Sequence, residues 1–290
     1  MQKGPVTPKG FGDILPSDAS RRKDFINKLS IVLEKYDFKP LETPIIEFAD
    51  TLLGKYGEEE KLIYTFEDKG GRKLALRYDL TVPLARFIAN NIGLLSPTFS
   101  RYQIGQVFRG EKPQKGRSRE FTQFDCDIVG SKSVEDDAKV ISAGIDGIRS
   151  LGFNKAKLAI NDRQNFNDLS IEDIRLIDKM YKIGKDKMPQ NLLEFIEKAT
   201  PTERLKQIFK ILENNYKLKE GKDFFFDPTL ARGLDYYTST VFEMKLNGNP
   251  EDLSVGGGGR YDNLIGMFAG REIPAVGFSF GIDRIIELTK

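Results

Sequence analysis

Two neighbouring runs near the middle of the chain carry the residue types best suited to bind a ligand. Residues 119–129 alternate strictly, and in a strand this period of two sends successive side chains to opposite faces. One face would hold Thr122, Phe124, Cys126 and Ile128, and the other Arg119, Phe121, Gln123, Asp125 and Asp127. A half-buried strand normally opposes an apolar face to a solvated one. A ring, an amide and two carboxylates suit the floor of a ligand site better than they suit a solvated face.

The loop before this run concentrates cationic side chains. The preceding run, 102–109, suits a strand, and Gly110, Pro113 and Gly116 mark a loop between the two. The charged residues of the loop and its ends are Arg109, Glu111, Lys112, Lys115, Arg117 and Arg119. Guanidinium groups can hold phosphate oxygens at two points, and an aromatic ring can stack on a base. The pattern therefore fits a nucleoside triphosphate site, and it fits a solvated basic hairpin equally well.

Composition excludes several kinds of site. The 290 residues include no histidine and one cysteine, and 45 basic residues against 43 acidic ones give a net charge of +2. Without histidine there is no Ser–His–Asp triad and no histidine zinc site. One cysteine provides neither an internal disulfide nor a cysteine metal cluster. Catalysis would therefore depend on carboxylates, arginines, backbone groups and the substrates themselves.

Hydropathy and net charge predict where the protein is found and which partners it has. No run approaches the ~18 apolar residues that cross a bilayer, and the first residues lack the apolar core of a signal peptide. We therefore expect a cytoplasmic protein with no membrane partner. The near-neutral charge neither demands nor excludes a nucleic-acid partner.

The flanking sequence predicts the elements that position these residues. Ser17 is expected to cap a helix over 19–36, and 38–48, with two prolines, suits an edge strand. A hairpin is expected over 62–66 and 73–77. Asp79 and Thr81 then stand at a strand-to-helix junction, where a carboxylate and a hydroxyl can hold an ammonium group or cap the helix.

The second half of the chain alternates helices and strands. Ser133 is expected to cap a core-facing helix. Strands are expected over 155–160, 224–227 and 273–280, and a helix carrying Arg284 over 281–290. The polar stretch 161–222 predicts a helical insertion with two apolar stripes. GGGG at 256–259 fits either a flexible turn or a backbone that approaches a ligand.

Three segments together resemble the motifs of histidyl-tRNA synthetases, which are class II aminoacyl-tRNA synthetases. VFRGEKPQKGRSREFTQFDCDIVG, at 107–130, is similar to motif 2, LARGLDYYT at 230–238 to the histidine signature, and GFSFGIDRI at 277–285 to motif 3. The resemblance runs from about Gly10 to the last residue. It implies an α+β fold with a mixed, mostly antiparallel sheet flanked by helices. Residues 1–160 and 223–290 would form the catalytic domain, and 161–222 a helical insertion near the tRNA acceptor stem.

The resemblance also implies roles for individual residues in ATP binding. Arg109 would hold the α-phosphate, Glu111 would lie near the adenine and Phe121 would stack on it. Arg117 and Arg284 would take the β/γ end, which Mg²⁺ accompanies. Arg232 would neutralise charge at the α-phosphorus, so that Arg109 and Arg232 are the expected catalytic residues.

For the amino acid, the resemblance implies L-histidine. Asp79 and Thr81 would bind its ammonium group, and Gln123 and Arg232 would lie near its carboxylate. Asp127 and Tyr237, the second of the paired tyrosines after Tyr236, would bind the two ring nitrogens. The implied function is ligation of histidine to tRNA(His), a step of protein biosynthesis. The helix and strand before residue 48 resemble motif 1, which implies a homodimer.

Two alternatives follow from the length of the chain. It stops at Lys290, shortly after motif 3, whereas full-length members of the family continue into an anticodon-binding domain. We therefore expect a catalytic fragment, an engineered core or a naturally short paralogue. A rival function is the non-catalytic regulatory subunit of ATP phosphoribosyltransferase, which has a similar architecture. The ATP-binding residues are typically replaced by other residues in that paralogue, and their presence here favours the enzyme.

Overall fold

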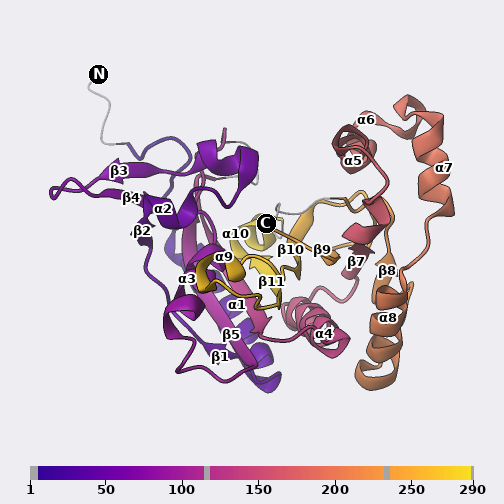
Figure 1. The fold of residues 1–290 in the computed structure, drawn as a ribbon, viewed down its shortest axis with the longest axis horizontal. Coiled ribbons are helices and arrows are strands. Elements are labelled where there is room, and N and C mark those ends of the chain that lie inside the picture. The colour runs from indigo at the N-terminus through magenta and orange to yellow at the C-terminus, as the bar shows by residue number, and fades with distance from the viewer. Residues whose placement is uncertain (1–5, 114–117, 232–235, 289–290) are drawn as a thin grey trace.

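The computed structural model describes residues 6–113, 118–231 and 236–288, and its centre is a mixed eight-stranded sheet (Figure 1). The strand order is β1-β5-β6-β11-β10-β9-β7-β8. In that order the bounds are Lys39–Pro40, Phe99–Phe108, Glu120–Val129, Ala275–Gly281, Ser254–Arg260, Thr240–Lys245, Lys157–Asp162 and Phe224–Phe226. Only the outermost pairs, β1 with β5 and β7 with β8, are parallel. The predicted mixed, mostly antiparallel sheet flanked by helices is confirmed.

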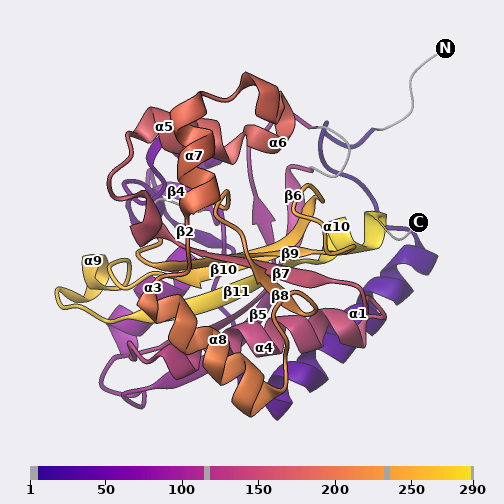
Figure 2. The same ribbon diagram turned by 90° about the vertical axis from the view of Figure 1, so that its right-hand side faces the viewer.

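Long helices cover one face of this sheet and form the main core with it (Figure 2). They are α1 (Pro16–Lys35), α4 (Val134–Ser150) and α8 (Glu203–Tyr216), joined by the short α10 (Ile282–Glu287). Packing is close enough to require a glycine in α4. A Cβ at Gly147 would lie 2.7 Å from the ring of Phe280, so a larger residue there would push α4 off the sheet.

A smaller layer lies beside the main sheet, at the left of Figure 1. Its three strands, in the order β2-β4-β3, are Ile46–Phe48, Lys73–Leu76 and Thr65–Glu67. The surrounding helices are α2 (Ala49–Leu52), the 3₁₀-helix η1 (Gly57–Leu62), α3 (Thr81–Asn91) and α9 (Gly266–Ala269). A second apolar cluster joins these elements. The hairpin predicted over 62–66 and 73–77 is present, with its first strand starting later, at Thr65.

The helical stretch predicted over 161–222 divides between two cores. The 3₁₀-helix η2 (Arg163–Phe166) and the helices α5 (Ile171–Asp178), α6 (Met180–Ile183) and α7 (Gln190–Lys198) share a small apolar cluster of their own. The 3₁₀-helix η3 (Lys185–Lys187) connects α6 to α7. The apolar stripe of α8 instead belongs to the main core. We therefore propose that the inserted module spans 163–199 and that α8 is part of the catalytic domain.

Helix starts differ from the sequence expectation at one place and agree at another. The first helix begins at Pro16 with Leu15 at the cap position and no capping side chain, so the cap predicted at Ser17 is wrong. A proline in the first turn has no N–H to leave unpaired, which explains the earlier start. Ser133 does cap α4, since its hydroxyl accepts from the backbone N–H of Glu135 at 3.2 Å. Among the described residues, no helix has both the length and the apolar character that a membrane crossing requires.

The two serines provide a matched test of these helix starts. Ser133→Ala removes a cap and should lower the free energy of unfolding by about 0.5–2 kcal/mol. Ser17→Ala removes an exposed hydroxyl that caps nothing and should change it by less than ~0.5 kcal/mol. Urea denaturation of both variants measures the difference, and equal losses would contradict the assigned helix starts.

Candidate active site

Strand β6 forms the floor of a cavity of about 690 Å³. Its alternation is as predicted: Phe121, Gln123, Asp125 and Asp127 line the cavity, while Phe124, Cys126 and Ile128 pack into the main core on the opposite face. Ten consecutive residue pairs hold β6 against β5, from Phe108 opposite Glu120 to Phe99 opposite Val129. Because this hairpin is regular, the polar face of β6 stays aligned along its whole length. Arg119 points elsewhere and donates to the carbonyl of Glu111 at 3.0 Å.

Glycines of β10 and β11 continue the floor beside β6. Gly256, Gly257, Gly258 and Gly277 all line the cavity. A Cβ at Gly277 would lie 1.9 Å from Oδ1 of Asp127, so a side chain there would displace that carboxylate. The four-glycine run is therefore an interior strand rather than a flexible turn, and it brings the sheet backbone close to whatever the cavity holds.

Asp127 sits in a buried ion pair. Arg101 stands directly opposite it on β5, and the Arg101 guanidinium lies 2.7 Å from Oδ2 of Asp127. The Tyr261 hydroxyl donates to Oδ1 at 2.5 Å. Both residues of the pair are almost fully buried. Burial raises the pKa of Asp127, whereas Arg101 and the Tyr261 hydrogen bond oppose that rise.

Asp79 and Thr81 occupy the wall where α3 begins. Oδ1 of Asp79 accepts from the backbone N–H groups of Thr81 at 3.1 Å and Val82 at 3.0 Å, and from the Tyr56 hydroxyl at 2.9 Å. Asp79 thus satisfies the first turn of α3 and also lines the cavity. Its Oδ2 lies 3.5 Å from the Tyr236 hydroxyl. Burial raises the pKa of the Asp79 carboxyl.

Arg109 and the aromatic rings form another part of the wall. The Arg109 guanidinium lies 4.2 Å from the ring centre of Tyr78 and 5.1 Å from that of Phe121, and its Nε donates to the Tyr78 carbonyl at 3.1 Å. The Tyr78 hydroxyl in turn donates to Glu59. Stacking on two rings fixes a guanidinium while leaving its donors available at the ring edges.

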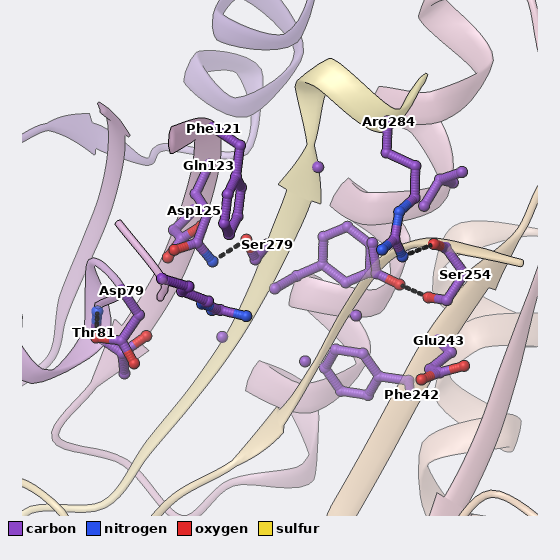
Figure 3. Close-up of a pocket in the computed structure, with 18 of the residues that line it drawn as sticks. Asp79, Thr81, Phe121, Gln123, Asp125, Phe242, Glu243, Ser254, Ser279 and Arg284 are labelled. Carbon is purple, nitrogen blue, oxygen red and sulfur yellow. Dashed lines mark hydrogen bonds between the residues drawn. The ribbon is translucent and has the colours of Figure 1, made fainter. Parts of the chain in front are cut away.

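Arg284 lies across the cavity from Asp79 and Thr81 (Figure 3). It comes from α10, and its guanidinium donates to the Ser254 carbonyl at 2.7 Å. Glu111 also lines the cavity, as do Tyr236 and Tyr237, whose rings are 5.0 Å apart. The structure therefore brings ten of the expected site residues to one cavity. Arg117 and Arg232, the other two, lie outside the described residues.

Several lining residues were not singled out from the sequence. They include Glu59, Asp178, Glu243, Ser254 and Ser279. Asp178 comes from the inserted module with its neighbour Lys179, and Arg175 ties that module to Glu58 of η1 by an exposed ion pair of 2.9 Å. In the segment GGRYD at 258–262, Tyr261 lines the cavity, whereas Arg260 and Asp262 do not. Arg260 points into the protein and pairs with Asp137 at 2.5 Å.

The cavity has two chemically different ends. Carboxylates and tyrosine hydroxyls gather near Asp79 and Asp127, which suits a ligand with an ammonium group and a polar ring. Arg109, Arg284 and Phe121 suit phosphates and a base. A volume of this size is ordinary for a small-molecule site, and a single continuous cavity places the two ligands next to each other.

Comparisons of the sequence and of the structure with known proteins both find histidyl-tRNA synthetases. The model of the histidyl-tRNA synthetase family matches residues 10–180 and 184–285. The histidine–tRNA ligase of Aeropyrum pernix is 43% identical over 98% of this chain and 74% of its own length. A crystal structure of histidyl-tRNA synthetase from a Nostoc species has a TM-score of 0.83 at 30% identity, covering 98% of this chain and 74% of that one.

A structure described as an ATP phosphoribosyltransferase regulatory subunit/histidyl-tRNA synthetase, from Bacillus halodurans, is also similar. Its TM-score is 0.82 at 23% identity, and the match covers 100% of this chain and 84% of that one. At that identity the likeness shows the fold alone.

The buried pair predicts a large loss of stability when one partner is removed. Arg101→Met leaves Asp127 buried without its cation and should cost about 3–5 kcal/mol in the free energy of unfolding. Adding Asp127→Leu should recover part of that loss. Arg175→Met, which breaks the exposed pair with Glu58, should cost less than ~1 kcal/mol. Urea denaturation measures all three, and equal costs for the Arg101 and Arg175 variants would contradict the burial assigned to Asp127.

Asp125 predicts an unusual dependence of stability on pH. Burial, with a smaller contribution from Asp127, raises its pKa to about 7, although Arg101 opposes the rise. The folded state thus holds a proton that the unfolded chain loses near pH ~4. Binding of this proton adds to the free energy of unfolding. The contribution is complete below pH ~4 and is lost as the pH rises to ~7, by at most ~1.4 kcal/mol per pH unit.

An asparagine in place of Asp125 removes this titration. Asp125→Asn should therefore lose less stability than the unmodified protein between pH 5 and 7. Urea midpoints at several pH values give the comparison. Parallel curves for the two proteins would show that Asp125 does not titrate in this range.

Proposed function

Because this chain belongs to the histidyl-tRNA synthetase family, we propose that it activates L-histidine with ATP and transfers the histidyl group to the 3′ end of tRNA(His). The observation that carries the proposal is the single cavity in which carboxylates face one end and arginines with an aromatic ring face the other. Histidine, with an ammonium group and an imidazole, matches the first end. ATP matches the second.

The ATP end is assigned from the side chains that line it. Arg109 is held by stacking on Tyr78 and by the Tyr78 carbonyl, so its guanidinium is fixed before the α-phosphate arrives. Phe121 provides the ring on which the adenine stacks, with Glu111 beside it. Arg284, anchored to the Ser254 carbonyl, takes the far phosphates together with Arg117.

Mg²⁺ enters with the ATP phosphates and neutralises part of their charge. It is usually bound through phosphates and one or two carboxylates. Glu287 lines the cavity and stands on the same helix as Arg284, so the donor chemistry at this end fits the ion.

The histidine end is assigned to the carboxylates. Asp79 and Thr81 bind the ammonium group, and Arg232 with the Nε2 group of Gln123 binds the carboxylate. Asp127 and Tyr237 bind the two ring nitrogens, with Tyr236 bonded to Asp79 behind them. Oδ1 of Asp127 accepts from the Tyr261 hydroxyl. Oδ2 lies 2.7 Å from Arg101 in an ion pair and has no hydrogen-bond partner among the described residues, so it can accept from a ligand. The ion pair with Arg101 favours the charged form of Asp127, which accepts from the imidazole N–H.

These positions allow the reaction to proceed without a covalent bond between the protein and either substrate. The histidine carboxylate attacks the α-phosphorus in line, the bond to the β-phosphate oxygen breaks, and pyrophosphate leaves. Arg109 and Arg232 stabilise the negative charge that builds on the α-phosphate. Holding both substrates in one cavity supplies much of the rate. The terminal hydroxyl of the tRNA then attacks the histidyl carbonyl and AMP leaves.

The partners of the protein follow from its surfaces. Exposed apolar side chains lie on and around the three-stranded sheet: Ile45, Ile46, Phe48, Leu53 and Phe66. We propose that a second copy covers them through the helix and strand that resemble motif 1, forming a homodimer. The inserted module would meet the acceptor stem of the tRNA, and the cytoplasm is the proposed location.

The role of Asp127 gives a test of the proposed function. Asp127→Asn retains the size of the side chain but loses its charge, so the imidazole loses a charge-assisted bond worth about 1.5–3 kcal/mol. The KM for histidine in the activation reaction should rise about 10- to 100-fold, and the KM for ATP should change less than about twofold. The control is Tyr36→Phe, which removes a hydroxyl bonded to Asp146 outside the cavity and should alter neither constant.

Two results would contradict the assignment. An unchanged KM for histidine in the Asp127 variant would remove this residue from the ring site. Histidine binding without any activation by the unmodified protein would favour the regulatory-subunit function instead.

A further inference from the structure

Asp125 is a lining carboxylate to which the family resemblance assigns no role. It stands between Gln123 and Asp127 on the cavity face of β6 and is only 3% exposed. The Ser279 hydroxyl hydrogen-bonds its carboxylate. Its Oδ1 is buried with no hydrogen-bond partner among the described residues. A buried carboxylate oxygen without a donor is costly, so this position is suited to a donor that arrives with the ligand.

The adjacent amide presents a second acceptor. Nε2 of Gln123 donates to Oγ of Ser279 at 2.9 Å (Figure 3), and Oε1 of the same amide is buried without a partner in the described part of the chain. Ser279 therefore orients both side chains, accepting from one and donating to the other. A ligand group that satisfies a carboxylate oxygen and an amide oxygen together must offer more than one N–H, and an ammonium group does so.

Charged groups surround Asp125 on every side. Those that act on it or feel its charge are Arg77 and Arg101, the carboxylates of Asp79 and Asp127, and the Tyr237 phenol. Both arginines are engaged elsewhere: Arg101 pairs with Asp127, and Arg77 donates to the backbone carbonyls of Gln106 and Thr43. Gln103, opposite Asp125 on β5, donates to Thr43. None of these described side chains donates to Oδ1 of Asp125, and a ligand in the cavity can supply the donor.

Resting on the proposed function, we propose that Asp125 binds the α-ammonium group of histidine together with Asp79, so that two carboxylates hold one cation. Asp79 and Asp125 line the same cavity, and the charge of Asp79 is the smallest of the causes that act on the pKa of Asp125. Asp127 is two residues further along β6, about 6.6 Å at the usual rise of a strand. That is close to the reach from the ammonium to the far ring nitrogen of histidine, so Asp127 serves the ring while Asp125 serves the ammonium.

Protonation of Asp125 gives this arrangement a measurable signature. Its pKa of about 7 means that the carboxyl is half protonated near neutral pH in the free protein. An ammonium beside it favours the charged form, so binding releases a proton. Affinity should therefore rise with pH through 7, by up to about tenfold per unit below that value.

Three ligands separate a role at the ammonium from a role at the ring. Asp125→Asn should raise the Kd of L-histidine and of L-histidinol, which both carry the ammonium, about tenfold or more. The Kd of 3-(imidazol-4-yl)propionate, which lacks the ammonium, should change less than about twofold. Asp146→Asn removes a carboxylate outside the cavity, where it accepts from the Tyr36 hydroxyl, and is the control. It should leave all three values unchanged, and unchanged ATP binding shows that each variant is folded.

The outcomes are distinguishable from failure of the proposed function. An equal loss for all three ligands in the Asp125 variant would place the carboxylate at the ring and overturn the inference. An unchanged Kd for histidine would overturn it as well. If the unmodified protein does not bind histidine, the proposed function fails, and this inference fails with it.

Proton release tests the same assignment independently. Calorimetry at pH 7 in phosphate and in Tris, with β-(1,2,4-triazol-3-yl)alanine as ligand, counts the protons released without titration of the ligand ring. The unmodified protein should release a fraction of a proton per ligand, and the Asp125→Asn variant close to none. The same release from both proteins would contradict the inference.

Discussion

The site depends on a buried ion pair between two neighbouring strands. Arg101 of β5 and Asp127 of β6 face each other at 2.7 Å in a place that water scarcely reaches. Burial raises the pKa of Asp127 and so favours the neutral acid, which would offer the ligand different hydrogen bonds. The cation opposite lowers that pKa and so favours the charged form. A shift of the hairpin register by one residue would separate the pair and turn the polar face of β6 into the core. The pair therefore forms in only one register of β5 against β6.

The rest of the cavity is arranged around this constraint. Tyr261 reaches Asp127 from the end of β10, and Gly277 leaves the space that the carboxylate occupies. Asp79 is held by the first turn of α3 rather than by a cation. Asp125 has an oxygen with no donor among the described residues. Among the described residues, Oδ1 of Asp125 and Oδ2 of Asp127 are the buried carboxylate oxygens without a hydrogen-bond donor, and N–H groups of the substrate can satisfy them.

Sequence reasoning succeeded where a periodic pattern fixes the outcome. The period of two along 119–129 was enough to separate the cavity face from the core face, and Ser133 was recognisable as a helix cap. Packing adds what periodicity does not show. The apolar stripe of α8 joins the main core, and the bounds of the insertion stay a prediction. Arg101 was missed because its role appears only when β5 and β6 are paired in register. The roles assigned to Arg117 and Arg232 stay predictions, since both lie outside the described residues.

The most direct test of the account is histidine-dependent exchange of pyrophosphate into ATP by this 290-residue chain. The account predicts exchange with L-histidine and none above background with the other amino acids, because only histidine presents both an ammonium group and a ring with two nitrogens to the carboxylates of β6. Exchange with several amino acids, or binding of histidine and ATP without exchange, would contradict the claim that this cavity is a histidine-activating site.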